Sequence, residues 1–237
     1  MAEQAGYLKF IESFNRIHKY LQKYTNSDDN VSFSDLLYRS KNHPMLSLYL
    51  DELHVFRKLR NIIVHQTDDF EQVIATPSEE VVLRIKFIEQ QLIDPVKLDV
   101  FKGDVVRFDV NGNLKDALKI SKEKEFLKFP LYDGDKFVGL VTSRAIAKWL
   151  QKEAKEDAIT LDEKMKDLLI YERDGHYQFI NMNTTVYEAW YLYRTSDKKI
   201  EALFVTESGK NDEEILAIIT NDDLIKYLYS NNLYVFH

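Results

Sequence analysis

The second half of the chain contains the same pattern twice, and this repetition strongly limits the folds available to it. One copy reads FPLYDGDKFVGLVTSRAIAKWL from Phe129 to Leu150, and the other reads ALFVTESGKNDEEILAIITNDDLIKYL from Ala202 to Leu228. In each copy two short apolar runs rich in β-branched residues flank a turn, the second run ends in threonine, and an amphipathic helix follows at once. The pattern predicts a β-hairpin that leads directly into the N-terminus of a helix.

Each copy is preceded by a further strand-turn-helix pattern. These patterns read VVRFDVNGNLKDALKI over residues 105–120 and YQFINMNTTVYEAWYLY over residues 177–193. The complete unit is therefore β-α-β-β-α, and it recurs after about 70 to 80 residues. Because one unit exposes a face of a small sheet, we expect two units to pack face to face, with helix N-termini lining the clefts between them. Such clefts suit a small anionic ligand.

Helical patterning dominates the first part of the chain. Apolar residues at helical spacing predict helices over residues 4–24, 32–40, 46–66 and 77–92. Of the seven glycines only Gly6 precedes position 103, so the chain changes character near residue 95.

These patterns together predict an α+β protein. We expect an all-helical bundle over residues 1–93, followed by two β-α-β-β-α repeats within residues 95–230. The repeats are expected at about residues 95–152 and 168–230. The acidic segment that joins them, residues 151–167, is expected to be helical.

Composition excludes several classes of site. Lys plus Arg number 32 against 39 Asp plus Glu, a net charge of −7, so any contact with RNA must be local. The absence of cysteine excludes disulfides, thiolate metal sites and cysteine nucleophiles. His18, His43, His54, His176 and His237 show no paired metal spacing, so we expect no metal site.

The N-terminus lacks the basic-then-apolar order of a secretion signal, and no apolar run approaches about 18 residues. A cytoplasmic protein that does not span a membrane is expected.

The repeats carry motifs of a known family. The C-terminal half resembles a tandem pair of CBS domains, often called a Bateman module, over about residues 95–230. The resemblance rests on the β-α-β-β-α order, the FPLY strand at 129–132, the GLVT strand end at 139–142, and the Thr-x-x-Asp step at Thr220 and Asp223. It implies clefts that bind an adenine-containing ligand: AMP, ADP, ATP, S-adenosylmethionine or a cyclic dinucleotide.

The two copies match the family unequally. The second copy keeps Thr220 and Asp223, which the resemblance assigns to phosphate and ribose. The first keeps Thr142 but has Ala145 in place of the acid, with Arg144 beside it as a candidate phosphate contact. Residues expected to contact the base are Val106, Phe108, Phe129, Pro130, Phe179 and Ile180. Thr220 and Asp223 have an alternative role that involves no ligand: they form a capping box that only stabilises the start of the helix.

The helical half contains a second motif. Arg60, Asn61 and His65 form an Arg-Asn-x-x-x-His pattern, which resembles that of HEPN domains, small helical bundles that include metal-independent ribonucleases. In that interpretation Arg60 stabilises charge on a phosphodiester and His65 moves a proton, with Asn61 orienting the ring or the substrate.

The spacing of this motif sets a condition on catalysis. Arg60 and His65 lie about 140° apart around a helix, so both reach one phosphate only if the helix ends near Val64 or a second subunit completes the site. The alternative places these cations near a helix C-terminus, where the dipole favours them. Residues 1–93 contain 11 Lys plus Arg and 13 Asp plus Glu, so the bundle has no overall basic field.

The combined expectation is a cytoplasmic, homodimeric sensor. The CBS pair binds an adenine nucleotide and controls the HEPN-like bundle. The output is either RNA cleavage gated by nucleotide or contact with a protein partner, and no other cofactor is required.

Overall fold

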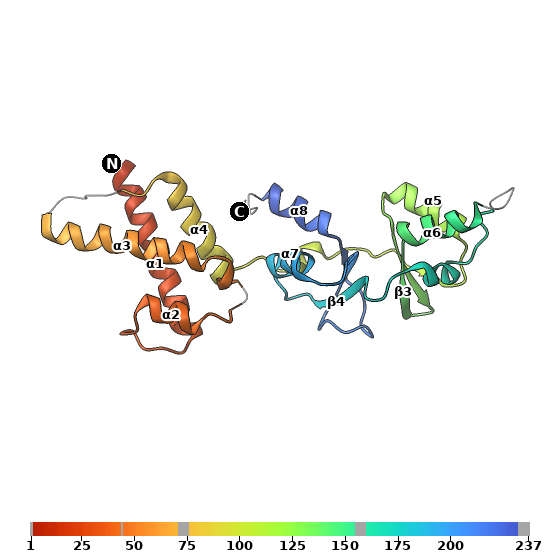
Figure 1. The fold of residues 1–237 in the computed structure, drawn as a ribbon, viewed down its shortest axis with the longest axis horizontal. Coiled ribbons are helices and arrows are strands. Elements are labelled where there is room, and N and C mark those ends of the chain that lie inside the picture. The colour runs from red at the N-terminus through yellow and green to blue at the C-terminus, as the bar shows by residue number, and fades with distance from the viewer. Residues whose placement is uncertain (1, 44, 71–75, 155–159, 232–237) are drawn as a thin grey trace. The chain divides into compact units, whose positions relative to one another are not determined.

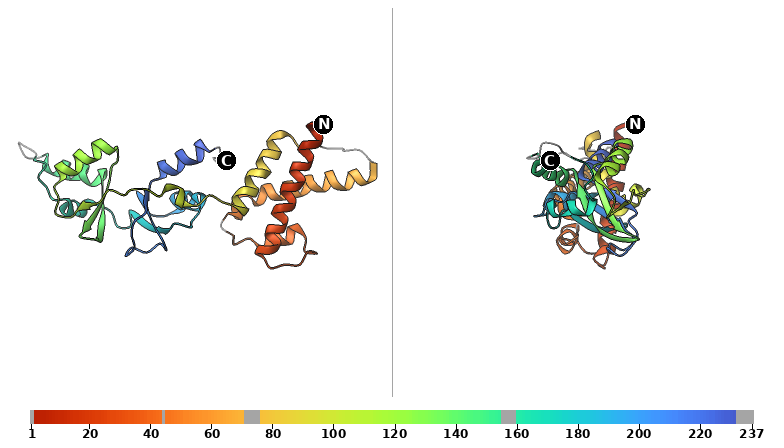
Figure 2. Two further views of the ribbon diagram at one scale, coloured as in Figure 1. Left: turned by 180° about the vertical axis from the view of Figure 1, so that it is seen from behind. Right: turned by 90° about the vertical axis from the view of Figure 1, so that its right-hand side faces the viewer.

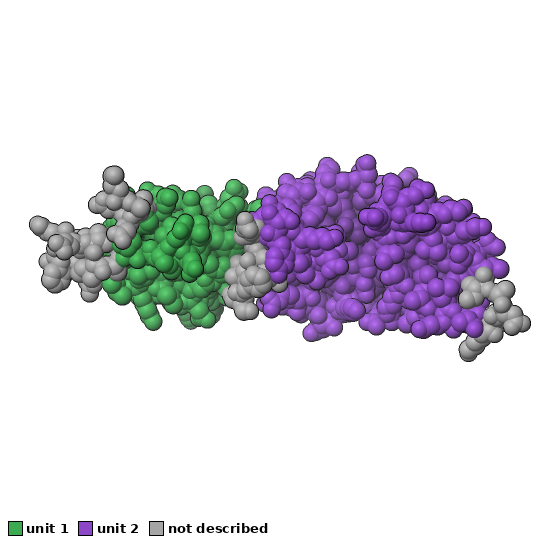
Figure 3. Space-filling model, turned by 90° about the horizontal axis from the view of Figure 1, so that it is seen from above, with its two compact units in different colours: residues 1–96 green, residues 97–237 purple. Residues whose placement is uncertain are grey.

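The computed structural model describes residues 2–43, 45–70, 76–154 and 160–231, with side chains described from residue 6 to 64 and beyond 75 within these ranges. The chain divides into two compact units, residues 1–96 and 97–237, which Figure 3 distinguishes by colour.

The first unit is helical, as the periodicity predicted. Its α-helices are α1 (Ala2–Tyr24), α2 (Phe33–Arg39), α3 (Leu50–Phe70) and α4 (Glu79–Ile93), with a 3-10 turn at Leu46–Leu48. The predicted helix over residues 46–66 was wrong at both ends, because the 3-10 turn precedes it and α3 continues to Phe70. Ser32 caps α2 by accepting a hydrogen bond from the backbone N–H of Asp35, and Ser78 caps α4 by accepting one from Val81. Such a cap typically stabilises a protein by about 1 kcal/mol.

The core of this unit forms along one face of α1. Phe10, Phe14, Ile17 and Leu21 recur at helical spacing and are all buried. Phe10 meets Phe56 of α3 edge to face at a centroid distance of 5.8 Å. Two arginine–carboxylate pairs support the bundle, Arg16 with Glu89 and Arg84 with Glu52, and each uses two nitrogens of the guanidinium.

The second unit contains the β-α-β-β-α pattern twice (Figure 1), as predicted. The first repeat comprises β1 (Phe108–Asp109), α5 (Leu114–Lys124), β2 (Lys128–Asp133), β3 (Lys136–Thr142) and α6 (Ser143–Glu153). The second comprises β4 (Tyr177–Asn181), α7 (Val186–Thr195), β5 (Ala202–Thr206), β6 (Ala217–Ile219) and α8 (Asn221–Ser230). Short 3-10 segments, Leu98–Phe101 and Met165–Tyr171, precede the repeats.

Each repeat has one three-stranded sheet. The orders are β1-β2-β3 and β4-β5-β6, with the first pair parallel and the second antiparallel. In the first repeat α5 and α6 cover one face of the sheet, an arrangement that Figures 1 and 2 both show. Because side chains alternate along a strand, Phe129 and Leu131 of β2 face these helices while Tyr132 faces the other repeat.

The outer faces of the two sheets pack against each other. Tyr132 and Leu140 of the first repeat are buried with Ala202, Phe204 and Ile215 of the second. The ring of Phe137 lies edge to face with Phe204 at 4.9 Å and with Tyr177 at 5.5 Å. This aromatic layer holds the repeats in one unit.

The connections differ in how well the sequence predicted them. The DGD sequence forms the expected hairpin turn, with Gly134 at φ +60° between β2 and β3. The acidic joining segment is not a continuous helix in its described parts, since α6 ends at Glu153 and the chain resumes as a 3-10 segment at Met165. Among the described residues, no helix is both long and apolar enough to cross a membrane.

Candidate functional site

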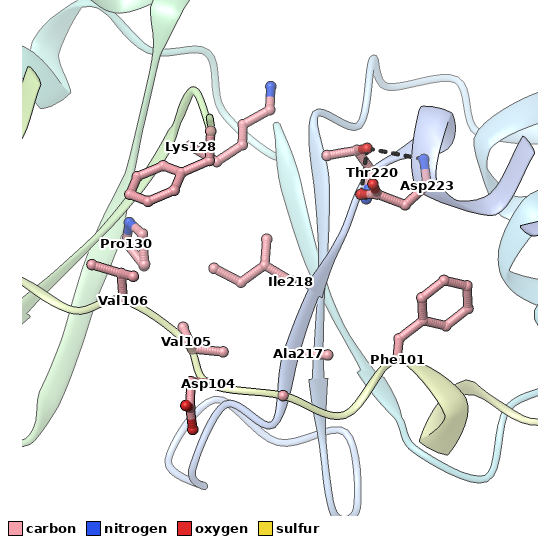
Figure 4. Close-up of a pocket in the computed structure, with 12 residues that line it drawn as sticks. Phe101, Asp104, Val105, Val106, Lys128, Pro130, Ala217, Ile218, Thr220 and Asp223 are labelled. Carbon is pink, nitrogen blue, oxygen red and sulfur yellow. Dashed lines mark hydrogen bonds between the residues drawn. The ribbon is translucent and has the colours of Figure 1, made fainter. Parts of the chain in front are cut away.

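A cleft of about 250 Å³ lies between the two repeats (Figure 4). Val105, Val106 and Pro130 form one wall, and Ala217 and Ile218 form the other. The remaining lining residues are Phe101, Gly103, Asp104, Phe126, Lys128, Thr220 and Asp223. The walls are therefore apolar. Thr220 and Asp223 lie at one end, where α8 begins, while Asp104 lies at the opposite end and Lys128 comes from β2 (Figure 4).

One wall comes from a segment that crosses between the repeats. Residues 97–106 precede β1, yet Leu98 N–H donates to the Thr184 carbonyl at 2.9 Å and Gly103 N–H donates to the Leu216 carbonyl at 3.1 Å. The start of the first repeat is thus tied to the backbone of the second. Because of this crossing, Val105 and Val106 reach the cleft that ends at Thr220.

Thr220 and Asp223 form the polar end of the cleft. Asp223 Oδ2 accepts from the Thr220 backbone N–H at 2.8 Å and from the Thr220 hydroxyl at 2.6 Å, while Asp223 N–H donates to Thr220 Oγ1 at 3.3 Å. Thr220 and Asp223 therefore form the capping box that was predicted as the alternative to ligand binding. Oδ1 takes part in none of these three bonds, so capping leaves one carboxylate oxygen for a ligand hydroxyl.

A larger cavity of about 780 Å³ adjoins this end and shares Phe126, Lys128, Thr220 and Asp223 with the cleft. Its other charged lining residues are Glu125, Lys198, Lys199, Glu201, Asp222 and Lys226. Lys128 pairs with Glu201 across the repeats at 2.8 Å. Burial raises the pKa of Glu201, but the hydrogen bond and charge of Lys128 outweigh it, so the pKa is lowered and the carboxylate stays ionised.

Tyr193 of α7 supports the floor of this region. Its hydroxyl donates to the Ile219 carbonyl at 2.7 Å, one residue before Thr220. Burial raises the pKa of Tyr193 far above its usual value, so the phenol remains a neutral donor. The hydrogen bond fixes the end of β6 and with it the first turn of α8.

The structure brings four of the predicted ligand-binding residues together at the cleft: Val106, Pro130, Thr220 and Asp223. Phe108 and Phe129 lie instead in the helix-covered core of the first repeat. Phe179 packs in the aromatic layer, with its ring 5.4 Å from that of Phe137, and Ile180 is buried.

Lys128 and Ile218 line the cleft and were missed by sequence reasoning. Strand alternation could have indicated both. Lys128 shares a strand face with Pro130 rather than with Phe129, and Ile218 lies two residues before Thr220.

The equivalent position in the first repeat is occupied by the chain itself. Thr142 starts α6 as Thr220 starts α8, but its backbone N–H donates to Glu172 at 2.6 Å. Arg144 contacts the Tyr171 carbonyl at 3.5 Å, and His176 Nε2 lies 2.9 Å from the Leu140 carbonyl oxygen. Glu172 has only 5% of its side chain exposed. The backbone N–H of Thr142, at the start of α6, is thus already satisfied by an internal carboxylate.

The HEPN-like motif lies on α3. Arg60 and Asn61 line a pocket of about 240 Å³ within the helical unit. The side chain of His65 lies outside the described residues. Since α3 runs to Phe70, the helix does not end near Val64, and Arg60 is not in the last turn. The dipole explanation for Arg60 was therefore wrong, and one helix cannot bring Arg60 and His65 to the same phosphate.

Within the described residues, no group of three or more acidic or histidine side chains is arranged to hold a metal ion.

Comparison with known proteins identifies the C-terminal half. The family model "CBS domain" matches residues 96–152 and 174–230. A homoserine O-acetyltransferase from Methanobrevibacter ruminantium is 33% identical over 79 residues, which is 32% of this chain. The chain spans only 15% of that relative's length.

Several solved structures also resemble the chain at low sequence identity. The CBS domain protein TA0289 of Thermoplasma acidophilum is 18% identical with a TM-score of 0.44, covering 59% of this chain and 72% of its own. The CBS domain pair of protein MJ0100, solved with 5′-methylthioadenosine and S-adenosyl-L-methionine, is 17% identical with a TM-score of 0.45, covering 58% and 98%. CBSX2, solved with AMP, is 17% identical with a TM-score of 0.42, also covering 58% and 98%.

The family match falls on the two β-α-β-β-α repeats, each with one three-stranded sheet. The chain contains a tandem pair of CBS domains, at residues 96–152 and 174–230.

Proposed function

We propose that the CBS pair binds an adenine-containing ligand in the cleft at Thr220 and Asp223, and that this ligand regulates the helical unit. The observation that carries the proposal is the cleft itself, in which apolar walls from both repeats meet a helix N-terminus and a carboxylate. A purine ring suits the apolar walls, and ribose hydroxyls suit Asp223 Oδ1 as acceptor. The candidate ligands are AMP, ADP, ATP, S-adenosylmethionine and a cyclic dinucleotide.

The adjoining cavity supports a ligand that carries phosphate. Lys198, Lys199 and Lys226 line it beside the shared Lys128. Lysine ammonium groups and the backbone N–H groups at the start of α8 both attract phosphate oxygens. The base would lie between the walls, and the phosphates would extend toward these lysines.

Regulation follows from which residues the ligand touches. The cleft wall at Val105 and Val106 belongs to the crossing segment, residues 97–106, which continues from α4 through Asp94 and Pro95. A ligand that binds one arrangement of the two repeats more tightly shifts the population toward it. The shift acts on the stretch of chain that leaves the helical unit.

Two outputs are proposed for the helical unit. In the first, two copies form a homodimer and Arg60, Asn61 and His65 cleave RNA without a metal. The course of α3 supports the requirement for a second subunit, since one helix separates Arg60 from His65. In the second, the helical unit binds a protein partner.

Calorimetry with a panel of adenine ligands tests the binding proposal. Wild-type protein should bind at least one ligand, and Asp223→Ala should weaken that binding at least tenfold. Glu188→Ala is the matched control, because Glu188 makes the same capping box with Thr185 at α7 but is not part of the cleft lining. Equal affinities for wild type and Asp223→Ala, or no binding at micromolar concentrations, would contradict the proposal.

The choice of output is tested by RNA cleavage in EDTA, with and without the ligand found above. The ribonuclease proposal expects cleavage by wild type and none by His65→Ala. Absent cleavage in both would favour the protein partner, to be sought with the ligand-bound and ligand-free forms.

A further inference from the structure

The pocket of about 240 Å³ in the helical unit combines three of its helices. His18 comes from α1, Ser34 from α2, and Arg57, Arg60 and Asn61 from α3. Phe14, Ser32 and Phe33 complete the lining. The rings of Phe14 and Phe33 lie 4.4 Å apart, and His18 meets Phe33 edge to face at 5.5 Å. The pocket is therefore lined by packed aromatic rings and by polar side chains from all three helices.

Two guanidinium groups lie one turn apart in this pocket. Within the described parts of the chain, neither Arg57 nor Arg60 forms an ion pair, and Arg57 Nε is buried without a hydrogen-bond partner. Arg16 and Arg84 of the same unit, by contrast, each pair with a carboxylate. A buried donor without a partner is costly, and like charges one turn apart repel. An anion between them removes both penalties.

His18 supplies a second polar atom without a partner, because its Nε2 is buried and makes no hydrogen bond. Burial lowers the pKa of His18, a hydrogen bond to the Val31 backbone opposes this, and the positive charge of Arg60 lowers the pKa further. The net shift is downward, so the ring is neutral at pH 7. An anion bound beside it would reverse the effect of Arg60 and favour the protonated ring.

We infer that this pocket binds a phosphate group, held by Arg57 and Arg60, with His18, Asn61 and Ser34 completing its hydrogen bonds. Guanidinium groups match phosphate oxygens in geometry as well as charge. A phosphate group fits within the pocket of about 240 Å³. The site shares Arg60 and Asn61 with the proposed ribonuclease motif but requires neither His65 nor the cleft of the CBS pair.

The test is calorimetry on the full chain with inorganic phosphate and pyrophosphate, and with a 5′-phosphorylated trinucleotide against its 5′-hydroxyl form. Binding of phosphate and pyrophosphate, with no preference between the two trinucleotides, would identify a free anion as the ligand. Preference for the 5′-phosphorylated trinucleotide would identify a terminal nucleic-acid phosphate, and either result supports the site. Arg57→Ala and Arg60→Ala should each weaken binding at least tenfold, as expected for charge-assisted hydrogen bonds.

Lys58→Ala is the matched control, since it removes one positive charge from an exposed position of the same helix. It should change the affinity less than twofold. No binding at millimolar concentration, or equal weakening by Lys58→Ala and Arg60→Ala, would overturn the proposal. Circular dichroism checks that each variant is folded, and Arg60→Lys, which keeps the charge, covers the case in which Arg60→Ala does not fold.

Proton uptake provides an independent readout. Calorimetry in buffers of different ionisation enthalpy should show that wild type takes up more protons than His18→Gln when phosphate binds near pH 7, because the proton exchange of phosphate itself is common to both proteins. Asp223→Ala should leave phosphate binding intact, so failure of this site and failure of the adenine-ligand site are distinguishable. An equal proton change in wild type and His18→Gln would exclude His18 from the site.

Discussion

The carboxylate of Glu172 accepts a hydrogen bond from the backbone N–H of Thr142 at 2.6 Å, across 30 residues of chain. It occupies the start of α6, where the second repeat uses Asp223 from its own helix at the start of α8. The backbone N–H groups of the two equivalent threonines are therefore satisfied in different ways. Asp223 lines the cleft and keeps one carboxylate oxygen outside its capping bonds, whereas the cleft lining includes neither Thr142 nor Glu172.

This difference predicts one adenine ligand per chain. Calorimetric titration of wild type should give a stoichiometry near one, because Glu172 already accepts the Thr142 N–H and position 145 carries Ala in place of an acid. A stoichiometry of two, with both sites sensitive to mutation of Thr142 and Asp223, would contradict the interpretation.

Glu172→Ala should destabilise the second unit by about 1–3 kcal/mol, since it leaves the buried Thr142 N–H without its acceptor. Urea unfolding monitored by fluorescence measures the change. Glu123→Ala is the control, because it removes an exposed glutamate of α5 in the same repeat. A loss no larger than that of the control would show that the Glu172 contact contributes little.

The caps at Thr220 and Thr185 are chemically alike, so Thr220→Ala and Thr185→Ala should each lower the free energy of unfolding by about 1 kcal/mol. They should differ in function. Only Thr220→Ala should weaken the binding of the adenine ligand, because Thr220 lines the cleft. Denaturant titration and ligand titration on the same samples check both statements, and equal ligand affinities in the two variants would argue against a role for Thr220.

Phe204 lies at the centre of the layer between the repeats and is fully buried. Phe204→Ala should lower the free energy of unfolding by about 3–5 kcal/mol. Phe204→Ala should also weaken the binding of the adenine ligand, because the cleft is formed by both repeats and depends on how they pack. Phe204→Leu, which keeps most of the apolar volume, should recover part of both losses in the same assays. A variant with lower stability and unchanged ligand affinity would show that the cleft tolerates loosening of this layer.

Stability should respond to pH through His18. Its folded-state pKa is lowered, mainly by burial, so the unfolded chain binds more protons below its own pKa of about 6.5. The contribution of His18 is therefore present above that pH and lost as the pH falls through it. The difference in free energy of unfolding between wild type and His18→Gln should decrease from pH 7.5 to pH 5.5, measured by urea titration without phosphate. An increase over this range would show that the charged ring is favoured in the folded protein.

The sequence by itself determined the order of the elements. Helical spacing in α1 and the alternation in β2 are local consequences of which residues are apolar, and they predicted the helical first part and both β-α-β-β-α repeats. Residue types also predicted that Thr220 and Asp223 start a helix together, since a threonine followed three residues later by an acid is a local signal. The ends of α3 were predicted wrongly, because packing rather than helix propensity decides where a helix stops.

Tertiary structure alone decided which residues share a site. Phe129 and Pro130 are adjacent in sequence but lie on opposite faces of β2, so one enters the core and the other the cleft. The acceptor of the Thr142 N–H lies 30 residues away, and His18 and Arg60 line one pocket from different helices. Local periodicity reports how each segment buries its own apolar face. It carries no information about which distant carboxylate or ring reaches a given backbone group, because that depends on how the packed segments are joined in space.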